Sequence, residues 1–334
     1  MIPSRSFVRL VDVAREAGVS QMTVSNAYRF PHKVLLKTRQ QVFQAAEALG
    51  YVPNFTARDL ASGDTRFVAA LVPTIKNSNF ARMIEGLNQA LVNESYQLLI
   101  GLGDSQGSEL EAVKGLMGHR PTGIVLVGGD HSHATRKLLR KLQISVVETW
   151  NLDGPHIDMA AGFSLYAAAY DLTRYLISKG YKKIGFAGYS SSRRRYGDRQ
   201  KGFQDALREV DLQSDLIVTA AEDLGYSGGG ATLMDLLRQE PSLDAVVCTT
   251  DIFAAGALFE CRRLGLSVPR DIAIAGFGDF EIAAAIEPTL TTVRTNGFAI
   301  GQCAGNLILK RARREAMDSK IHDVGYEIVV RGST

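Results

Sequence analysis

A short stretch near the N-terminus, residues 18–30, carries polar side chains that could recognise nucleic-acid bases. The side-chain amides of Gln21 and Asn26 can each donate one hydrogen bond and accept another at the same time, which suits bidentate pairing with adenine. The guanidinium of Arg29 could bind a phosphate group. This chemistry requires an element that fits a DNA groove and presents these side chains outward.

Two short helices joined by a turn would supply that element. In residues 10–17, apolar side chains recur at helical spacing: Leu10, Val13, Ala14 and Ala17. Gly18 can adopt the left-handed conformation that ends a helix, and Ser20 can cap a second helix. Val24 and Ala27 would pack this second helix against the first. The pattern predicts a helix-turn-helix, whose second helix enters a major groove, in preference to another kind of helical hairpin.

A third helix is predicted from Thr38 to Leu49, and a further segment follows it to Gly63. Residues 8–63 resemble, without a gap, the DNA-binding headpiece and hinge of the LacI/GalR family of bacterial repressors. The matching residues are Asp12-Val-Ala14, Gly18-Val-Ser20, Thr23-Val-Ser25, Thr38-Arg39, Leu49-Gly-Tyr51, Pro53-Asn54, Ala57-Arg58 and Leu60.

The resemblance implies a division of labour among the DNA contacts. Gln21, Met22 and Asn26 would read base edges. A second group would mostly position the protein on phosphates: Ser20, Thr23, Ser25, Arg29, Thr38, Tyr51 and Asn54. Residues 54–65 would form a hinge that contacts DNA through Ala57 and Leu60, and the paired Leu60 side chains would enter the central minor groove.

Two positions depart from the family pattern. The family more often has Arg or His where this chain has Asn26, so the preferred base cannot be inferred from the resemblance. Leu35 stands where the family favours a capping Ser, which leaves the start of the third helix open.

Composition limits the classes of protein to consider. With 334 residues, 46% of them hydrophobic and 22% charged, the chain can form two or three domains with proper cores. It has no apolar run of 18 residues and no visible secretory signal. Its three cysteines, Cys248, Cys261 and Cys303, lack CxxC spacing, so we expect reduced core residues of a cytoplasmic protein.

Charge is distributed unevenly along the chain. Residues 1–60 hold eight Lys or Arg against four Asp or Glu, a net charge of +4, whereas the whole chain has +3 and residues 61–334 therefore have −1. A basic module on a nearly neutral body suits a nucleic-acid binder.

From Phe67 onward, short apolar runs alternate with amphipathic segments. The predicted strands are Phe67–Val72, Gln97–Gly101, Gly123–Val127, Ser145–Glu148, Lys183–Ala187, Leu216–Thr219, Ala245–Thr249 and Asp271–Gly276. The alternation predicts an α/β core of two lobes, which follows the all-α headpiece in the chain. Each lobe would be a doubly wound parallel sheet covered by helices. A ligand would bind in the cleft between the lobes, at the carboxyl ends of the strands.

The body is similar to the type I periplasmic-binding fold that the same repressors use. The matches are Arg199-x-x-Gly-Phe203, Arg263-Leu-Gly-Leu266, Val268-Pro-x-Asp-Ile272, Gly276-Phe277 and Pro288-x-Leu-Thr-Thr-Val293. Within the family, gluconate-type repressors look most similar, through Val146-Val-Glu148, Ile157-Asp-x-Ala-x-Gly-Phe163 and Phe259-Glu-Cys-x-Arg-Leu-Gly-Leu266. The resemblance implies a headpiece over 1–53, a hinge over 54–65, a first lobe of 66–163 and 294–323, and a second lobe of 164–293 and 324–334.

The expected effector site follows from position matching. Arg199 matches the family's ligand-binding arginine, whose fork can pair with hydroxyls or a carboxylate. The remaining candidates are Thr74, Phe80, His131, Trp150, Thr250, Asp251 and Asp279. Trp150 could stack on a sugar or belong to the core, and His131 is expected in a surface loop that could border the cleft. Gly276-Phe-Gly-Asp279 has one acid where many members have two, which modestly favours an acidic sugar.

No catalytic constellation, metal site or cofactor is expected. The glycine-rich residues 101–107 have the wrong spacing for a dinucleotide loop, and HExxH, GxSxG and P-loop patterns are missing. We therefore expect a dimeric repressor of a near-palindromic operator, controlled by a sugar or sugar acid such as gluconate or keto-gluconate, and not an enzyme. A solute-binding or sugar-modifying protein with the same core is the alternative. No heptad repeat follows the strand at Val329–Val330, which favours a dimer over a tetramer.

Overall fold

The computed structural model describes residues 8–52, 65–103, 106–189, 194–220 and 225–334. These residues form two compact units, residues 1–65 and residues 66–334, and each is described here by itself.

The first unit is the expected helix-turn-helix with a third helix. Its elements are α1 (Leu10–Glu16), α2 (Gln21–Arg29), a 3-10 turn (Pro31–Lys33) and α3 (Leu36–Leu49). Gly18 has φ +64°, the left-handed conformation predicted for the turn. The Ser20 hydroxyl accepts a hydrogen bond from the Thr23 backbone amide at 3.1 Å and caps α2 as predicted. Leu35 gives α3 no side-chain cap, so α3 begins without the serine that the family favours.

A single small core holds these three helices together. Val13, Val24 and Val42, one from each helix, are completely buried and pack with alanines of the same helices. Burial of three branched side chains stabilises the unit by about 1.5–3 kcal/mol each. Because Val24 and Ala27 occupy the inner face of α2, the opposite face of α2 is left for binding.

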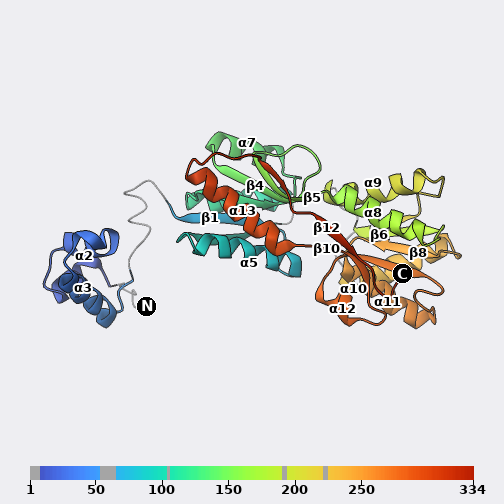
Figure 1. Ribbon diagram of the computed structural model, residues 1–334, viewed down its shortest axis with the longest axis horizontal. Coiled ribbons are helices and arrows are strands. Elements are labelled where there is room, and N and C mark those ends of the chain that lie inside the picture. The colour runs from blue at the N-terminus through green and yellow to red at the C-terminus, as the bar shows by residue number, and fades with distance from the viewer. Residues whose placement is uncertain (1–7, 53–64, 104–105, 190–193, 221–224) are drawn as a thin grey trace. The chain divides into compact units, whose positions relative to one another are not determined.

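The second unit contains two six-stranded sheets. The first sheet is entirely parallel, in the order β11-β5-β4-β3-β1-β2. Its strands are β1 (Phe67–Val72), β2 (Gln97–Leu102), β3 (Gly123–Val127), β4 (Ser145–Asn151), β5 (Met159–Phe163) and β11 (Ile321–Asp323). Helices α5 (Ser78–Val92) and α13 (Gly297–Ala312) cover one face, and α6 (Gln106–Gly118) and α7 (His133–Leu142) cover the other (Figure 1).

The second sheet repeats this arrangement in the order β12-β10-β9-β8-β6-β7. Its strands are β6 (Ile184–Tyr189), β7 (Ile217–Ala220), β8 (Ala245–Cys248), β9 (Ala273–Gly278), β10 (Thr291–Thr295) and β12 (Tyr326–Val329), of which only β12 is antiparallel to its neighbour. Helices α8 (Leu165–Ser178) and α9 (Arg194–Arg208) pack on one face. Helices α10 (Gly225–Gln239) and α11 (Asp251–Leu264) pack on the other, and α12 (Glu281–Ala285) follows β9.

The chain crosses between the two lobes three times. The crossings follow β5 at Phe163, β10 at Thr295 and β11 at Asp323, and Figure 1 shows β5, β10 and β12 where the lobes meet. Arg294 pairs with Gly278, and Thr295 pairs with Tyr326, so β10 stays in the second sheet to its end. The second crossing therefore lies two residues beyond the boundary expected from the sequence.

The described residues contain no helix that is long and apolar enough to cross a membrane. Cys248 and Cys261 are buried free thiols, and Cys303 is a half-buried one. Burial raises the pKa of the Cys261 thiol to about 12, which keeps it in the unreactive protonated form.

Candidate DNA-binding face and effector site

The outward face of α2 presents the side chains that sequence analysis assigned to base reading. Gln21 and Met22 are exposed, Met22 by 68%, and Asn26 is half-buried beside them. Arg29 in the last turn is also exposed. Because α2 is anchored through Val24 and capped by Ser20, these side chains project from a rigid element, as groove recognition requires.

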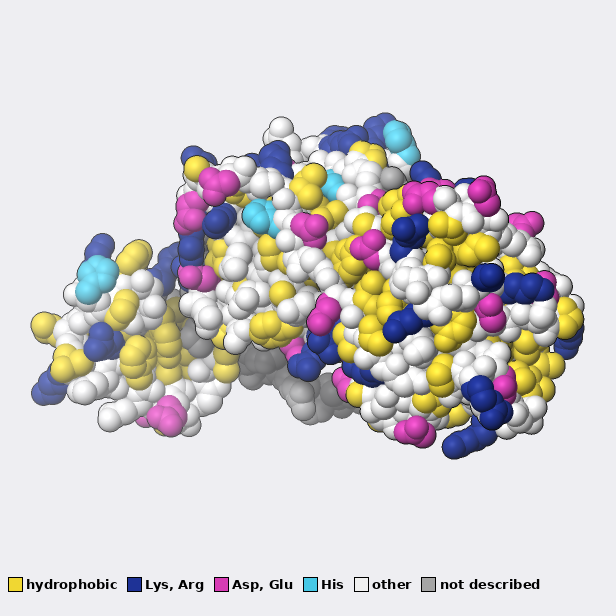
Figure 2. Space-filling model, turned by 45° about the vertical axis from the view of Figure 1, so that its right-hand side comes forward, with side chains coloured by type: hydrophobic (Ala, Val, Ile, Leu, Met, Phe, Trp, Pro, Cys, Tyr) yellow, Lys and Arg dark blue, Asp and Glu magenta, His cyan; other side chains and the backbone are white. Residues whose placement is uncertain are grey.

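The headpiece beyond α1 is electropositive. Between residues 18 and 46 the sequence has four cations and no acid: Arg29, Lys33, Lys37 and Arg39. Dark blue Lys and Arg side chains outnumber magenta acidic ones on the headpiece face seen in Figure 2. The acidic Asp12 lies on α1, where it accepts a hydrogen bond from the Arg9 backbone amide. This charge distribution would attract a phosphate backbone to the side of α2 and α3.

The remaining headpiece candidates divide into two sets. Thr38 is half-buried in the first turns of α3, and half-buried Tyr51 packs 6.1 Å from the ring of Tyr28. Thr23 and Ser25 are half-buried on α2. The hinge candidates Asn54, Ala57 and Leu60 lie outside the described residues.

Four aromatic rings form a continuous column where the two sheets' carboxyl ends meet. The centroids of Phe80 and Trp150 are 5.4 Å apart, and those of Trp150 and Phe163 are 6.5 Å apart. Phe163, at the end of β5, then stacks at 6.3 Å on Phe277 of β9, in the other lobe. All four rings are buried, so an aromatic surface runs from one lobe to the other.

Arg199 of α9 places a positive charge against this column. Its guanidinium carbon lies 4.6 Å from the Phe277 ring centre, and its Nη1 donates a hydrogen bond to the Thr249 carbonyl at 2.7 Å. Contact with an aromatic face stabilises a cation by about 0.5–2 kcal/mol. These two contacts hold Arg199 in one orientation where the lobes meet.

Trp150 reaches the column through an unusual backbone conformation. Its φ is +78°, in the left-handed region that bulky residues rarely adopt. The indole Nε1 donates to Met83 Sδ of α5 at 3.2 Å, whereas Glu148, two residues earlier on β4, faces α7. The neighbouring backbone makes room because residue 162 is glycine, where a Cβ would lie 2.5 Å from the Trp150 carbonyl oxygen.

The two aspartates proposed for the site are engaged inside the second lobe. Asp251 is fully buried and accepts hydrogen bonds from the Phe280 amide at 2.7 Å and from Thr292 Oγ1 at 2.5 Å. Burial raises its pKa to about 6. Asp279 forms ion pairs with Arg294 and Arg331, each at 2.6 Å. Both side chains are therefore committed to contacts within the lobe.

Two threonine candidates also have local roles. Thr250 Oγ1 accepts from the Phe253 amide at 3.3 Å and caps α11. Thr74 Oγ1 accepts from the Lys76 amide at 3.1 Å in the loop after β1. Neither contact stops the hydroxyl from donating a hydrogen bond to another group.

The prediction that His131 occupies a surface loop is wrong. Its side chain is only 3% exposed and lies 2.9 Å from Glu109, with Glu148 nearby. His133 is exposed at the start of α7. The signal was present in β4, because a glutamate inside the apolar run Val146-Val-Glu148 requires buried polar partners.

Sequence analysis missed the residues that bridge the lobes by hydrogen bonds. Asn79 Nδ2 of α5 donates to the Gly278 carbonyl at 2.7 Å and to Thr295 Oγ1 at 3.1 Å. Asn151 Nδ2, at the end of β4, donates to Asp198 Oδ2 of α9 at 2.7 Å. Asparagine has many uses at the ends of helices and strands, so no pattern in the sequence singled these two out.

Comparison with known proteins agrees with both units. The family described as "Bacterial regulatory proteins, lacI family" matches residues 9–54, and the "Periplasmic binding protein-like domain" matches residues 173–334. The HTH-type transcriptional regulator GntR of Escherichia coli K12 is 33% identical over 325 residues, covering 97% of this chain and 98% of that protein. The chain belongs to the LacI family of bacterial regulatory proteins. It is a DNA-binding transcriptional repressor with a helix-turn-helix and a periplasmic-binding-protein-like effector domain.

Other LacI-family proteins match over the same length. The regulator IdnR of Escherichia coli K12 is 33% identical over 323 residues, 96% of this chain and 97% of that protein. The crystal structure of a LacI-family regulator from Silicibacter pomeroyi has a TM-score of 0.91 at 30% identity, covering 98% of this chain and 99% of that one. The lac repressor dimer bound to operator has a TM-score of 0.88 at 20% identity, which supports the fold alone.

Proposed function

We propose that this LacI-family repressor responds to a small polyhydroxylated acid, gluconate or a keto-gluconate first, bound where its two lobes meet. The observation that carries this proposal is Arg199, a cation held against the aromatic column at the junction of the lobes. A carboxylate bound there would gain a fixed cationic partner, whose absence would cost several kcal/mol.

The surroundings of Arg199 favour an anion over a neutral sugar. Asp251 and Asp279, which could otherwise accept hydrogen bonds from sugar hydroxyls, are committed to Thr292 and to two arginines. The faces of Trp150 and Phe80 offer apolar contact for the C–H side of a sugar chain. Thr74 and Thr250 have hydroxyls that could donate to its oxygens, and His131 is assigned no contact.

Calorimetry on the full-length protein tests the effector directly. We expect gluconate or 2-keto-gluconate to bind more tightly than glucose or ribose. Arg199→Lys keeps the charge but loses the bidentate fork, so acid affinity should fall at least tenfold. Arg208→Lys, at an exposed position on the same helix, is the matched control and should leave affinity unchanged. Preferential binding of glucose or ribose would sink the acid assignment and leave the repressor assignment intact.

We further propose that the repressor acts as a homodimer on a near-palindromic operator, with α2 of each subunit in the major groove and Leu60 of each hinge at the centre. The exposed Gln21, Met22 and Arg29 support this orientation of α2. Sedimentation with a selected operator fragment should give two chains per duplex and a two-fold symmetric footprint. One chain on an asymmetric site would contradict this arrangement. A solute-binding protein would share only the α/β core, whereas the relatives named above match through the headpiece as well.

A further inference from the structure

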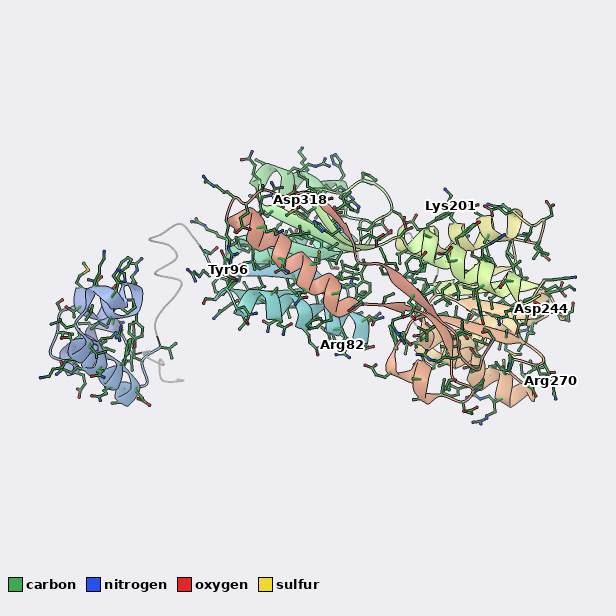
Figure 3. All side chains as sticks on the ribbon, in the orientation of Figure 1. Arg82, Tyr96, Lys201, Asp244, Arg270 and Asp318 are labelled. Atoms are coloured by element: carbon green, nitrogen blue, oxygen red, sulfur yellow. The ribbon has the colours of Figure 1, made fainter. Side chains whose placement is uncertain are left out.

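The first lobe buries a cluster of ionisable groups away from both candidate sites. Charged side chains such as Lys201 and Arg270 lie at the periphery of the protein (Figure 3), but Glu148 in the middle of β4 is completely buried. Arg136 Nη2 of α7 lies 3.5 Å from Glu148 Oε1, and His131 Nε2 lies 3.6 Å from the same oxygen. His156 Nδ1 lies 3.6 Å from the other oxygen, Oε2.

Both ring nitrogens of His131 lie within hydrogen-bond distance of neighbouring oxygens. Its Nδ1 lies 2.9 Å from Glu109 Oε2 of α6, and its Nε2 lies 2.9 Å from the Gly128 carbonyl oxygen. Although burial raises the pKa of Glu109, hydrogen bonds from His131 and others lower it overall, so Glu109 is an acceptor only. Both ring nitrogens of His131 are therefore already engaged by neighbouring groups.

His156 differs because its contacts are longer. Its side chain is 5% exposed, its Nε2 lies 3.4 Å from the Leu152 carbonyl oxygen, and its Nδ1 has no hydrogen-bond partner among the described residues. His156 is therefore the histidine of the cluster that can still gain a hydrogen bond to a carboxylate.

The loop that carries His156 connects the cluster to the junction of the lobes. The Ile157 amide, next to His156, donates a hydrogen bond to Glu148 Oε2. In the same loop, Asp153 accepts from Ser164 Oγ at 2.7 Å and from the Tyr166 amide at 3.0 Å, immediately after the first crossing. At the start of the loop, Asn151 bridges to Asp198 of the second lobe.

We propose that His156 is a regulatory proton-binding site. Its protonation draws the β4–β5 loop, residues 152–158, onto Glu148 and thereby changes the positions of Trp150 and of the first crossing between the lobes. A proton on Nδ1 converts a 3.6 Å approach into a charge-assisted hydrogen bond, which prefers about 2.7–2.9 Å. The loop must move to close that distance. Proton binding and effector binding are then linked, a consequence that rests on the function proposed above.

The electrostatic surroundings of His156 support this site. The Glu148 carboxylate beside it raises the pKa of His156, and this effect outweighs burial and the repulsion from Arg136, which lower it. Of the loop's other charged groups, Asp153 accepts a hydrogen bond from a backbone amide in the first turn of α8. Asp158 pairs with Arg311 of α13 at 2.6 Å and with Lys320 at 3.1 Å. Asp130, next to His131, is the remaining charge in the loop before α7.

Histidine NMR on the full-length protein measures the site directly. We expect the ring of His156 to titrate above the ordinary histidine value of 6.5, and the fluorescence of Trp150, the only tryptophan, to change with the midpoint of His156. His156→Gln should abolish this fluorescence transition, whereas His133→Gln, the matched control, should leave it unchanged. Glu148→Gln should lower the His156 midpoint. A His156 midpoint at or below the ordinary histidine value, or a Trp150 transition that survives His156→Gln, would overturn the proposal.

Gluconate titrations at pH 6 and pH 8 separate this inference from the proposed function. We expect its dissociation constant to change with pH in the wild type, by no more than tenfold per pH unit for one coupled proton, and to lose this dependence in His156→Gln. A wild-type dependence that persists unchanged in His156→Gln would refute the coupling. If gluconate binds at neither pH, the effector assignment fails, and the NMR and fluorescence titrations alone decide on the proton site.

Discussion

At the residue scale, Asp251 shows how burial makes a side chain sensitive to pH. Its pKa is raised from an ordinary 3.8 to about 6 by burial, although Thr292 and the Phe280 amide donate hydrogen bonds to it. The folded state therefore holds this proton more tightly than the unfolded state. Its contribution to stability is present below pH 4 and is lost as pH rises to about 6.

Asp251→Asn should remove this pH dependence and also leave one hydrogen-bond donor without an acceptor. The variant should be destabilised at every pH, by about 1–3 kcal/mol from the lost hydrogen bond. The loss in free energy of unfolding relative to wild type should be larger at pH 4.5 than at pH 7.5, because only the wild type is stabilised by protonation. Thermal unfolding at both values measures it, with exposed Asp235→Asn as the control. A loss that is the same at both pH values would show that Asp251 does not titrate in this range.

Asn26 and Arg29 should differ in what they contribute to DNA binding. Asn26→Ala should cost about 1–3 kcal/mol on the best site and relax one base position in each half-site. Arg29→Ala should weaken binding to all DNA sequences alike. It should also reduce the slope of log affinity against log salt concentration by about one per half-site. Selection from random DNA followed by salt titration separates the two effects, and exposed Gln44→Ala on α3 serves as control. Unchanged base preference in Asn26→Ala would remove it from the set of base-reading residues.

At the element scale, apolar runs predicted the central strands well. The bounds of β1 and β3 agree with the prediction, because each is a buried strand made almost entirely of branched or small apolar residues. The strands β5 and β10 were not predicted. Met159–Phe163 is short and rich in Ala and Gly, and Thr291–Thr295 is mostly threonine. Both become strands because a strand far along the chain pairs with each of them, β11 with β5 and β12 with β10.

The same limit applies to the candidate site. The resemblance assigned roles to Arg199 and to the exposed face of α2 from local position alone, and those roles stay predictions. It did not reveal that Thr292, 41 residues later, donates a hydrogen bond to Asp251, or that His131 is buried between Glu109 and Glu148. Those contacts depend on how separate strands and helices pack, and a local pattern carries no information about them.

Helix packing gives a prediction at this scale. Helices α5 and α13 approach so closely that a Cβ on Gly301 would lie 1.9 Å from the Met83 carbonyl oxygen. Gly301→Ala should therefore force the helices apart and destabilise the core by about 1–3 kcal/mol or more. Gly115→Ala on α6 is the matched control, because a Cβ there meets nothing within 4 Å. It should be neutral or stabilising by up to about 1 kcal/mol. Differential scanning calorimetry would show the contrast, and equal effects would refute it.

At the scale of the whole molecule, the uneven charge separates two kinds of binding. The first 60 residues carry +4 and the remainder −1, so salt should act mainly on the DNA-binding unit. With six or more phosphate contacts, operator affinity should fall about 10³-fold or more between 50 and 200 mM salt. The gluconate binding proposed at Arg199 would involve a single charge pair and should change far less. Parallel titrations at both salt concentrations test this, and equal losses would contradict it.

The three crossings also have a consequence for synthesis on the ribosome. The first lobe is not complete when its first five strands have emerged, because α13 and β11 belong to it and follow residue 296. Ala304, Leu307 and Ile308 of α13 fill the same core as Val68 and Leu87, so that core stays open until nearly the whole chain has been translated. The headpiece can fold early, but the nascent first lobe must wait with apolar surface exposed. This is a state in which chaperones bind and in which a stalled or truncated chain aggregates.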